Sequence, residues 1–247
     1  TEDEPCDVVF SQGAAYVSCS QANSVMVFDL ADLGAAPRRI ALDGEDPRSL
    51  SVGRHGEVYV ALFESGNGTT VLGGGLDPVA AGVLAFPPNV VDDPLGPWGG
   101  VNPPPNAGAG FQPPIDPSLP TPPGVSLIVR ESAAGAWLDD NGGDWTELVS
   151  GAQAGHSGRP VGWDLVDHDI AVIDPQAQGV RYVKRLMNAC MALGVNPASG
   201  EVTLVGTDGT NEVRYEPNLT GIFGRVLLAR VDPEGGAAPV VTDLNPH

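Results

Sequence analysis

"SVMVFDLA" at residues 24–31 decides the fold, because its pattern returns as "GVLAFPPN" at 82–89, "DIAVIDPQ" at 169–176 and "RVLLARVDP" at 225–233. Each copy is a short apolar run that ends at Asp or Pro, which is typical of a β-strand followed by a turn. Strand side chains alternate between the two faces of a sheet. We therefore predict that the following side chains are largely buried: Val25, Val27, Leu84, Phe86, Ala171, Ile173 and Leu227.

A second pattern precedes three of these copies. It reads "VVFSQGAAYVSC" at 8–19, "LSVGRHGEVYVAL" at 50–62 and "LGVNPASGEVTLV" at 193–205. Each has two apolar runs joined by a Gly-containing turn, which predicts a β-hairpin. Tyr16 and Tyr59 are 43 residues apart, an interval typical of a repeat built from four strands. Almost no stretch has helical periodicity, so the sequence predicts an all-β protein.

These patterns divide the chain into four units of four strands, at approximately 5–45, 46–132, 133–187 and 188–247. In this division the third unit consists of "AWLDD", "DWTELV", "HDIAVID" and "VRYVKRL". A segment at 87–124 with 13 Pro interrupts the second unit and cannot be a regular helix or a central strand. Its Trp98 and Phe111 are candidate contact residues for a protein partner. A surface loop without a partner is the alternative.

Two passages, "GWDLVDHDIAVID" at 162–174 and "NACMALGVNPASGEVTLVGTDGTNEVRYEPNLTGIFGRV" at 188–226, resemble the surface-layer-type, YVTN-repeat β-propellers of bacteria. The resemblance implies a β-propeller with four-stranded antiparallel blades, about four of them in this chain. Such rings usually close with six to eight blades, so we expect these four to belong to a larger ring. The family often accompanies c-type cytochrome or peroxidase-like domains, and the resemblance therefore implies a bacterial periplasmic or extracellular protein.

The acidic composition narrows the range of partners. The chain has 12 Lys+Arg against 31 Asp+Glu, a formal net charge of −19. This charge repels nucleic acid and anionic lipid, and no run of 18 apolar residues exists, so we expect neither nucleic-acid binding nor membrane insertion. The start, "TEDEPCDVV", lacks the regions of a signal peptide, as expected for a mature chain. The charge suits a basic protein partner. Because four blades are expected to belong to a larger ring, further blades of the same protein are the other expected neighbour.

The three cysteines are too widely spaced for a thiolate zinc site. A hairpin around "SQGA" places Phe10 opposite Ala15, and the same register places Cys6 opposite Cys19. Cys6 and Cys19 are therefore a candidate disulfide. Cys190 lies in the apolar run "ACMALGV" and is expected to be a buried thiol. No C-x-x-C-H motif is present, so any haem would lie on a partner or on a region absent from this chain.

Two acidic segments are candidate metal sites, with calcium as the ion that favours such oxygen ligands. The first, "DLVDHD" at 164–169, carries Asp164, Asp167, His168 and Asp169. The second, "TDGTNEVRYEPN" at 207–218, carries Asp208, Asn211 and Glu212. In a strand the imidazole of His168 and its flanking carboxylates point to opposite faces, so a polar strand start is the alternative for the first segment. A turn stabilised by its own side chains is the alternative for the second.

The stretch "AWLDDNGGDWTELV" at 136–149 carries Asp140, Gly142 and Trp145 where an Asp-box has its Asp, Gly and Trp. We interpret it as a structural turn, in which a carboxylate accepts turn amides, Gly takes a left-handed backbone conformation and Trp packs below. An EF-hand loop needs a ligand at Gly143 and Gly at Asp144, so the stretch does not match one.

No motif for catalysis is present: there is no G-x-S-x-G elbow and no phosphate loop, and the four His show no metal-ligand spacing. The sequence therefore favours a non-enzymatic, extracytoplasmic β-propeller that acts as a protein-interaction or assembly module. The alternative is an accessory propeller domain of a c-type cytochrome or peroxidase-like redox protein, whose metal centre lies outside this chain.

Overall fold

The structure is a computed structural model that describes residues 3–72, 95–97, 99, 127–139, 142–154, 166–176, 179–209 and 224–245. The chain forms two compact units. The first unit comprises Thr1–Gly68, Leu165–Asp208 and Arg225–His247, and the second comprises Thr69–Asp164 and Gly209–Gly224. Among the described residues the elements are strands with one short helix, so the all-β prediction is confirmed. That helix is too short to cross a membrane.

Array 1 of the first unit is a four-stranded sheet in the order β1 (Pro5–Ser11), β2 (Ala14–Cys19), β3 (Ser24–Asp29) and β4 (Arg38–Ala41). All its neighbours are antiparallel. Phe10 pairs with Ala15, as the hairpin register predicted.

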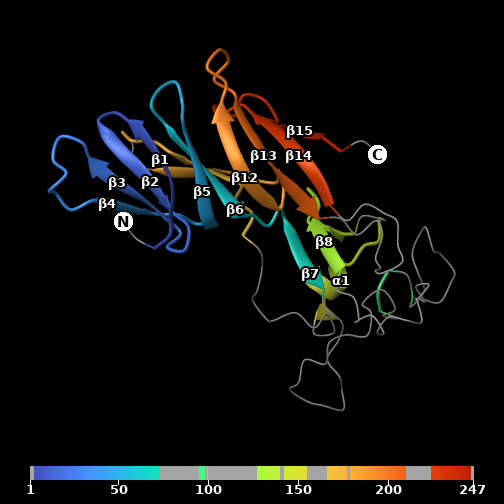
Figure 1. The fold of residues 1–247 in the computed structure, drawn as a ribbon. Helices are drawn as coiled ribbons and strands as arrows, with labels where there is room; N and C mark the ends of the chain where they lie inside the picture. The colour runs from blue at the N-terminus through green and yellow to red at the C-terminus, as the bar shows by residue number, and fades with distance from the viewer. Residues whose placement is uncertain are drawn as a thin grey trace, which may run out of the picture. The chain divides into compact units, whose positions relative to one another are not determined.

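The second sheet of the first unit contains two further antiparallel series of four strands. Array 2 runs in the order β5 (Glu45–Val52), β6 (Val58–Glu64), β10 (Ile170–Ile173) and β11 (Val180–Val183). Array 3 runs in the order β12 (Ala189–Val195), β13 (Val202–Gly209), β14 (Gly224–Val231) and β15 (Val240–Asp243). A bridge between Glu64 and Ala189 joins the two arrays. Figure 1 shows β12, β13 and β14 side by side in orange to red.

The pairing of β10 differs from the expected division, which assigned "HDIAVID" and "VRYVKRL" to a unit with residues 133–149. β10 instead pairs with β6, although residues 69–164 of the second unit separate the two strands in the sequence. Ala171 lies opposite Val60, and both side chains are fully buried. The spacing of the turn glycines Gly56 and Gly200 also shows that residues of the second unit are inserted into the series of strands. They are 144 residues apart, and 96 of these residues belong to Thr69–Asp164 of the second unit. The remaining 48 residues come close to the interval of 43 between Tyr16 and Tyr59.

Three of the four recurring segments become the third strand of an array, namely β3, β10 and β14. The burial prediction is confirmed for their side chains: Val25, Val27, Ala171, Ile173 and Leu227. The fourth segment, at 82–89 with Leu84 and Phe86, lies outside the described residues.

The central strands of array 2 have apolar neighbours on both faces. Val58 and Val60 of β6 belong to a cluster with Tyr16, Val25 and other side chains of array 1. Tyr59 and Ala61 of the same strand belong to a second cluster, which includes these side chains of array 3: Cys190, Val202, Leu204, Leu227, Ala229 and Val231. Burial on both faces explains why "VYVALF" and "IAVI" read as continuous apolar runs rather than as alternating ones.

The second unit has a three-stranded antiparallel sheet in the order β7 (Thr69–Leu72), β8 (Leu127–Glu131) and β9 (Trp137–Leu138). "DWTELV", expected as a strand, instead leads into helix α1 (Thr146–Val149). The Asp144 carboxylate accepts the backbone N–H of Thr146, which favours a turn at this point. Leu148 and Val149 of α1 then pack with Leu72, Val129 and Trp145.

Candidate functional site

Three turns of the first unit line an open cavity of about 370 Å³. The turns connect β5 to β6, β12 to β13 and β14 to β15. The first two turns carry glycines with left-handed backbones, Gly56 (φ 93°) and Gly200 (φ 79°), which only glycine adopts without strain. The cavity is lined by Arg54, His55, Glu57, Tyr59, Ser199, Gly200, Glu201, Asp232, Pro233 and Glu234.

One imidazole and two carboxylates meet in this cavity. One ligand atom each of His55, Glu57 and Glu234 lies within 4.8 Å of the other two. His55 and Glu234 are exposed, and Glu57 is half-buried. Glu57 Oε2 also accepts the backbone N–H of His55 at 3.1 Å, which holds this carboxylate beside the turn that carries the imidazole.

Neighbouring turns hold the His55 turn in place. The Ser11 hydroxyl donates to the Gly56 carbonyl at 2.7 Å, and Gln12 Nε2 donates to the His55 carbonyl at 3.1 Å. On the other side, the Arg54 guanidinium donates to the carbonyls of Pro197 and Ala198 in the β12–β13 turn. The backbone that presents His55 and Glu57 is therefore fixed by contacts from both directions.

Tyr59 lines the cavity with 2% of its surface exposed. Within the described part of the chain, no hydrogen bond is made by its hydroxyl group. Burial, and next the charge of Glu57, raise the pKa of Tyr59 to about 12, so the hydroxyl keeps its proton at neutral pH. Tyr59 therefore offers a protonated O–H toward the same cavity.

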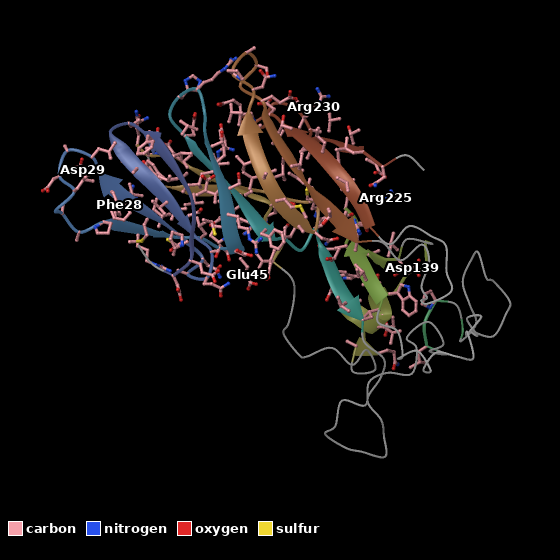
Figure 2. All side chains as sticks on the ribbon, viewed as in Figure 1. Phe28, Asp29, Glu45, Asp139, Arg225 and Arg230 are labelled. Atoms are coloured by element: carbon pink, nitrogen blue, oxygen red, sulfur yellow. The ribbon has the colours of Figure 1, made fainter. Side chains whose placement is uncertain are left out.

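The lining of the cavity carries more acidic than basic side chains, and the guanidinium of Arg54 is already engaged in a structural contact. Arg54 donates to backbone carbonyls of the β12–β13 turn. Glu201 lies 3.9 Å from Arg230 of β14, an ion pair whose arginine Figure 2 labels. Glu57, Asp232 and Glu234 contribute further negative charge to the lining.

The sequence interpretation missed this site. It found no metal-ligand spacing among the four His, and Glu234 is 177 residues away from Glu57 in the chain. The available signal was the alignment of the hairpins, which places turn residues of arrays 2 and 3 at equivalent positions. That alignment implies that the turns of arrays 2 and 3 lie close together only once the pairing of β10 with β6 is known.

His168 has a structural environment in the first unit. It is buried, its Nδ1 contacts the backbone carbonyl of Asp43, and the Asp43 carboxylate lies 3.7 Å away. Its ring stacks on Tyr182 with centroids 4.0 Å apart. The neighbouring Asp167 instead binds Arg185, through the backbone N–H at 3.0 Å and the guanidinium at 3.4 Å. Asp164, predicted with these residues, lies outside the described residues.

Asp169 is fully buried and accepts the backbone N–H groups of Leu186 and Met187 at 3.2 and 3.0 Å. The thiol of Cys190 also lies 3.4 Å from Asp169 Oδ1. Burial raises the pKa of Asp169 to about 6, although the two backbone hydrogen bonds oppose the shift. These partners give Asp169 a structural role, separate from that of His168.

Asp208 of the second candidate segment is also buried and hydrogen-bonded. Its Oδ1 accepts Asn67 Nδ2 at 2.9 Å and the backbone N–H of Asn188 at 3.1 Å. The carboxylate thus connects three chain segments of the first unit. Asn211 and Glu212 lie outside the described residues.

In the stretch at 136–149, a carboxylate accepts turn N–H groups, and among the described residues this carboxylate belongs to Asp139. Asp139 Oδ1 accepts the Gly143 N–H and its Oδ2 accepts the indole N–H of Trp145, both at 2.9 Å. Gly142 has a left-handed backbone (φ 81°), and Trp145 is buried. Asp140, the predicted turn residue, lies outside the described residues. Figure 2 labels Asp139, which lies in the second unit.

The predicted opposition of Cys6 and Cys19 does not occur. A register shift between Pro5 and Asp7 places Pro5, rather than Cys6, opposite Cys19. Cys6 is exposed and Cys19 is buried, and both are free thiols. Cys190 is free and buried, as expected. The bulge therefore moves Cys6 out of the position that a disulfide requires.

Trp98 and Phe111, the candidate contact residues of the Pro-rich segment, lie outside the described residues. No protein family model and no curated protein matches the sequence. A solved structure of Kuenenia stuttgartiensis hydrazine synthase aligns with 98% of this chain and 66% of that chain, at 11% identity and a TM-score of 0.28. The chain thus spans about two-thirds of that protein, and a TM-score this low carries no argument about fold or activity.

Proposed function

We propose that arrays 1, 2 and 3 are consecutive blades of a β-propeller, and that the chain acts as a non-enzymatic protein-interaction or assembly module outside the bacterial cytoplasm. The observation that carries the proposal is an apolar face of array 1 that joins none of the buried clusters of the described residues. A further four-stranded blade is the occupant that fits this face.

The face consists of two rows of directly opposed residues across β1, β2 and β3. One row is Val8, Val17 and Met26, and the other is Phe10, Ala15 and Phe28. Phe10 is 64% exposed and Val8 is 48% exposed. Phe28, labelled in Figure 2, is half-buried. A row of this kind is typical of a surface that packs against a partner.

The opposite face of array 1 supports the choice of occupant. Its Val9, Tyr16, Val25 and Val27 pack in one cluster with apolar side chains of array 2. Both faces of array 1 thus carry the same kind of side chain, and on one of them the neighbour is another four-stranded array. By the same packing, a further blade would cover Val8 and Phe10.

Array 3 offers a comparable face at the other end of the series. Val226 of β14 is 42% exposed and alternates with Leu227, which is buried in the cluster with array 2. Val240 of β15 lies opposite Arg230, on the same face as Val226, and is 47% exposed. Blades supplied by the same protein or by a partner protein would cover these faces and complete a ring.

Substitution of the exposed face tests the proposal. Phe10→Glu places a charge in the middle of the face, and we expect it to abolish the larger species that native wild-type protein forms in sedimentation velocity. Leu33→Glu is the matched control, because Leu33 is 70% exposed in the turn between β3 and β4. A wild-type protein that sediments as a 25.4 kDa monomer, or equal behaviour of the two variants, contradicts the proposal.

A further inference from the structure

We propose that the cavity between the β5–β6, β12–β13 and β14–β15 turns binds a divalent transition-metal ion such as Zn²⁺, with His55, Glu57 and Glu234 as its protein ligands. This site is independent of the apolar faces, which lie on the sheets rather than at these turns. The ion would join the β5–β6 turn to the β14–β15 turn.

The chemistry of the three side chains fits such an ion. Imidazole nitrogen and carboxylate oxygen are the ligand types that zinc accepts besides thiolate, with three protein ligands leaving one position open. A calcium ion would favour oxygen ligands alone. The presence of His55 beside Glu57 and Glu234 therefore favours a transition metal over calcium.

The geometry brings the ligand atoms to near-coordinating separation. The three atoms lie within 4.8 Å of one another. Zinc bonds of about 2.1 Å place neighbouring ligands of a tetrahedral site about 3.4 Å apart, so the side chains need to close by up to about 1.4 Å. His55 and Glu234 are exposed, and their tips have the freedom for this movement, whereas the contacts of Ser11, Gln12 and Arg54 hold the turn backbone.

A second observation also points to a polar ligand. Tyr59 lines the cavity with an exposed fraction of only 2%, and its hydroxyl makes no hydrogen bond to the described residues. The hydroxyl oxygen is not one of the fully enclosed polar atoms that lack a partner, so it stays accessible to a polar ligand. A water or hydroxide on the open position of the metal would accept the Tyr59 O–H.

Gly53 lets the carboxylate of Glu57 and the hydroxyl of Tyr59 pack closely against the backbone. A Cβ atom at this position would lie 2.5 Å from Glu57 Oε2 and 2.9 Å from the Tyr59 hydroxyl oxygen. A side chain at Gly53 would therefore displace both groups from their present positions.

Zinc binding to the full chain, first stripped of metal with a chelator, tests the inference by equilibrium dialysis and metal analysis. We expect one Zn²⁺ per chain for the wild type and a weakening of at least about tenfold for Glu57→Gln, Glu234→Gln and His55→Ala, the scale seen when groups supporting a metal site are lost. Because His55 and Glu234 are exposed, we expect these two variants to fold like the wild type, and circular dichroism checks this.

Glu201→Gln is the matched control, because Glu201 lines the same cavity but lies outside the three-residue cluster. This variant removes one negative charge from the cavity but no proposed ligand. Its affinity for Zn²⁺ should therefore fall less than threefold if coordination, rather than the charge of the cavity, holds the ion. Absence of zinc binding by the wild type overturns the inference. So does unchanged binding by Glu57→Gln and Glu234→Gln, or a loss in Glu201→Gln as large as theirs.

Discussion

Asp169 Oδ1 accepts the backbone N–H of Met187 at 3.0 Å, and this contact ties the start of β10 to the segment that leads into β12. The same carboxylate accepts Leu186 N–H through its other oxygen. Arrays 2 and 3 of the first unit are thus linked by a buried carboxylate as well as by strand pairing. The stability of the first unit should depend on it.

Replacing Asp169 with Ala leaves two buried backbone N–H groups without an acceptor. Each unsatisfied donor costs about 1–3 kcal/mol, so we expect the free energy of unfolding to fall by about 2–6 kcal/mol. Urea unfolding measures the change. The control is Asp29→Ala, since Asp29 is exposed and accepts only a local turn N–H, from Ala31. Equal losses in the two variants would refute the role assigned to Asp169.

The raised pKa of Asp169 predicts a pH dependence. Its pKa is about 6 in the folded protein against 3.8 ordinarily, so between these values the folded state binds more protons than the unfolded state. This contribution to stability is fully present below about pH 4 and is lost as the pH rises through 6, by at most about 3 kcal/mol. Asp169→Asn lacks the titrating group.

Urea unfolding of the wild type and of Asp169→Asn at about pH 4, 5 and 6.5 checks this sign. All other titrating groups are shared, so the stability difference between the two proteins isolates Asp169. The advantage of the wild type should shrink as the pH rises. An advantage that stays constant or grows contradicts the raised pKa.

The thiols should differ sharply in reactivity. Cys6 is exposed, whereas Cys19 and Cys190 are completely buried, and burial raises the pKa of the Cys190 thiol. Since the thiolate is the reactive form, iodoacetamide should label only Cys6 in the folded protein and all three thiols in urea. Peptide mapping by mass spectrometry gives the result. A peptide that joins Cys6 to Cys19 under non-reducing conditions would show the register at the bulge to be wrong.

The turn of the second unit depends on Asp139. Asp139→Ala removes the acceptor of both the Trp145 indole and the Gly143 N–H, and we expect a loss of about 2–4 kcal/mol in the local stability of this unit. Hydrogen exchange of residues 127–150 measures it. Asp144→Ala is the control, because Asp144 is exposed and caps only Thr146. Addition of calcium or of a chelator should leave the exchange unchanged, and a calcium-dependent slowing would contradict a purely structural turn.

The sequence predicted the features that are determined by residues close to one another in the chain, namely hairpin register and the burial of strand side chains. The hairpin register of Phe10 and Ala15 follows from a short turn, and the burial of Val25, Val27 and Ile173 follows from the composition of single strands. The one-residue displacement of Cys6 could not be predicted in this way, because a bulge depends on local backbone geometry that the apolar pattern does not encode.

The pairing of β10 with β6 could not be read from the sequence either. Val60 and Ala171 are 111 residues apart, and the apolar run of residues 82–86 fits the third strand equally well by pattern. The cluster of His55, Glu57 and Glu234 depends on that pairing and on the packing of arrays 2 and 3. No sequence pattern therefore indicated that these three residues lie together.

The central claim is that the apolar face of array 1 is covered by a further blade in the native assembly. Hydroxyl-radical footprinting of wild-type protein in its native assembly tests it directly, with Phe10 and Leu33 as the two reporters, which are 64% and 70% exposed in the single chain. We predict that Phe10 is strongly protected while Leu33 is oxidised, and that Phe10 becomes reactive when the assembly is dissociated by dilution. Oxidation of Phe10 at the same rate in the native material and in the dissociated chain would contradict the claim.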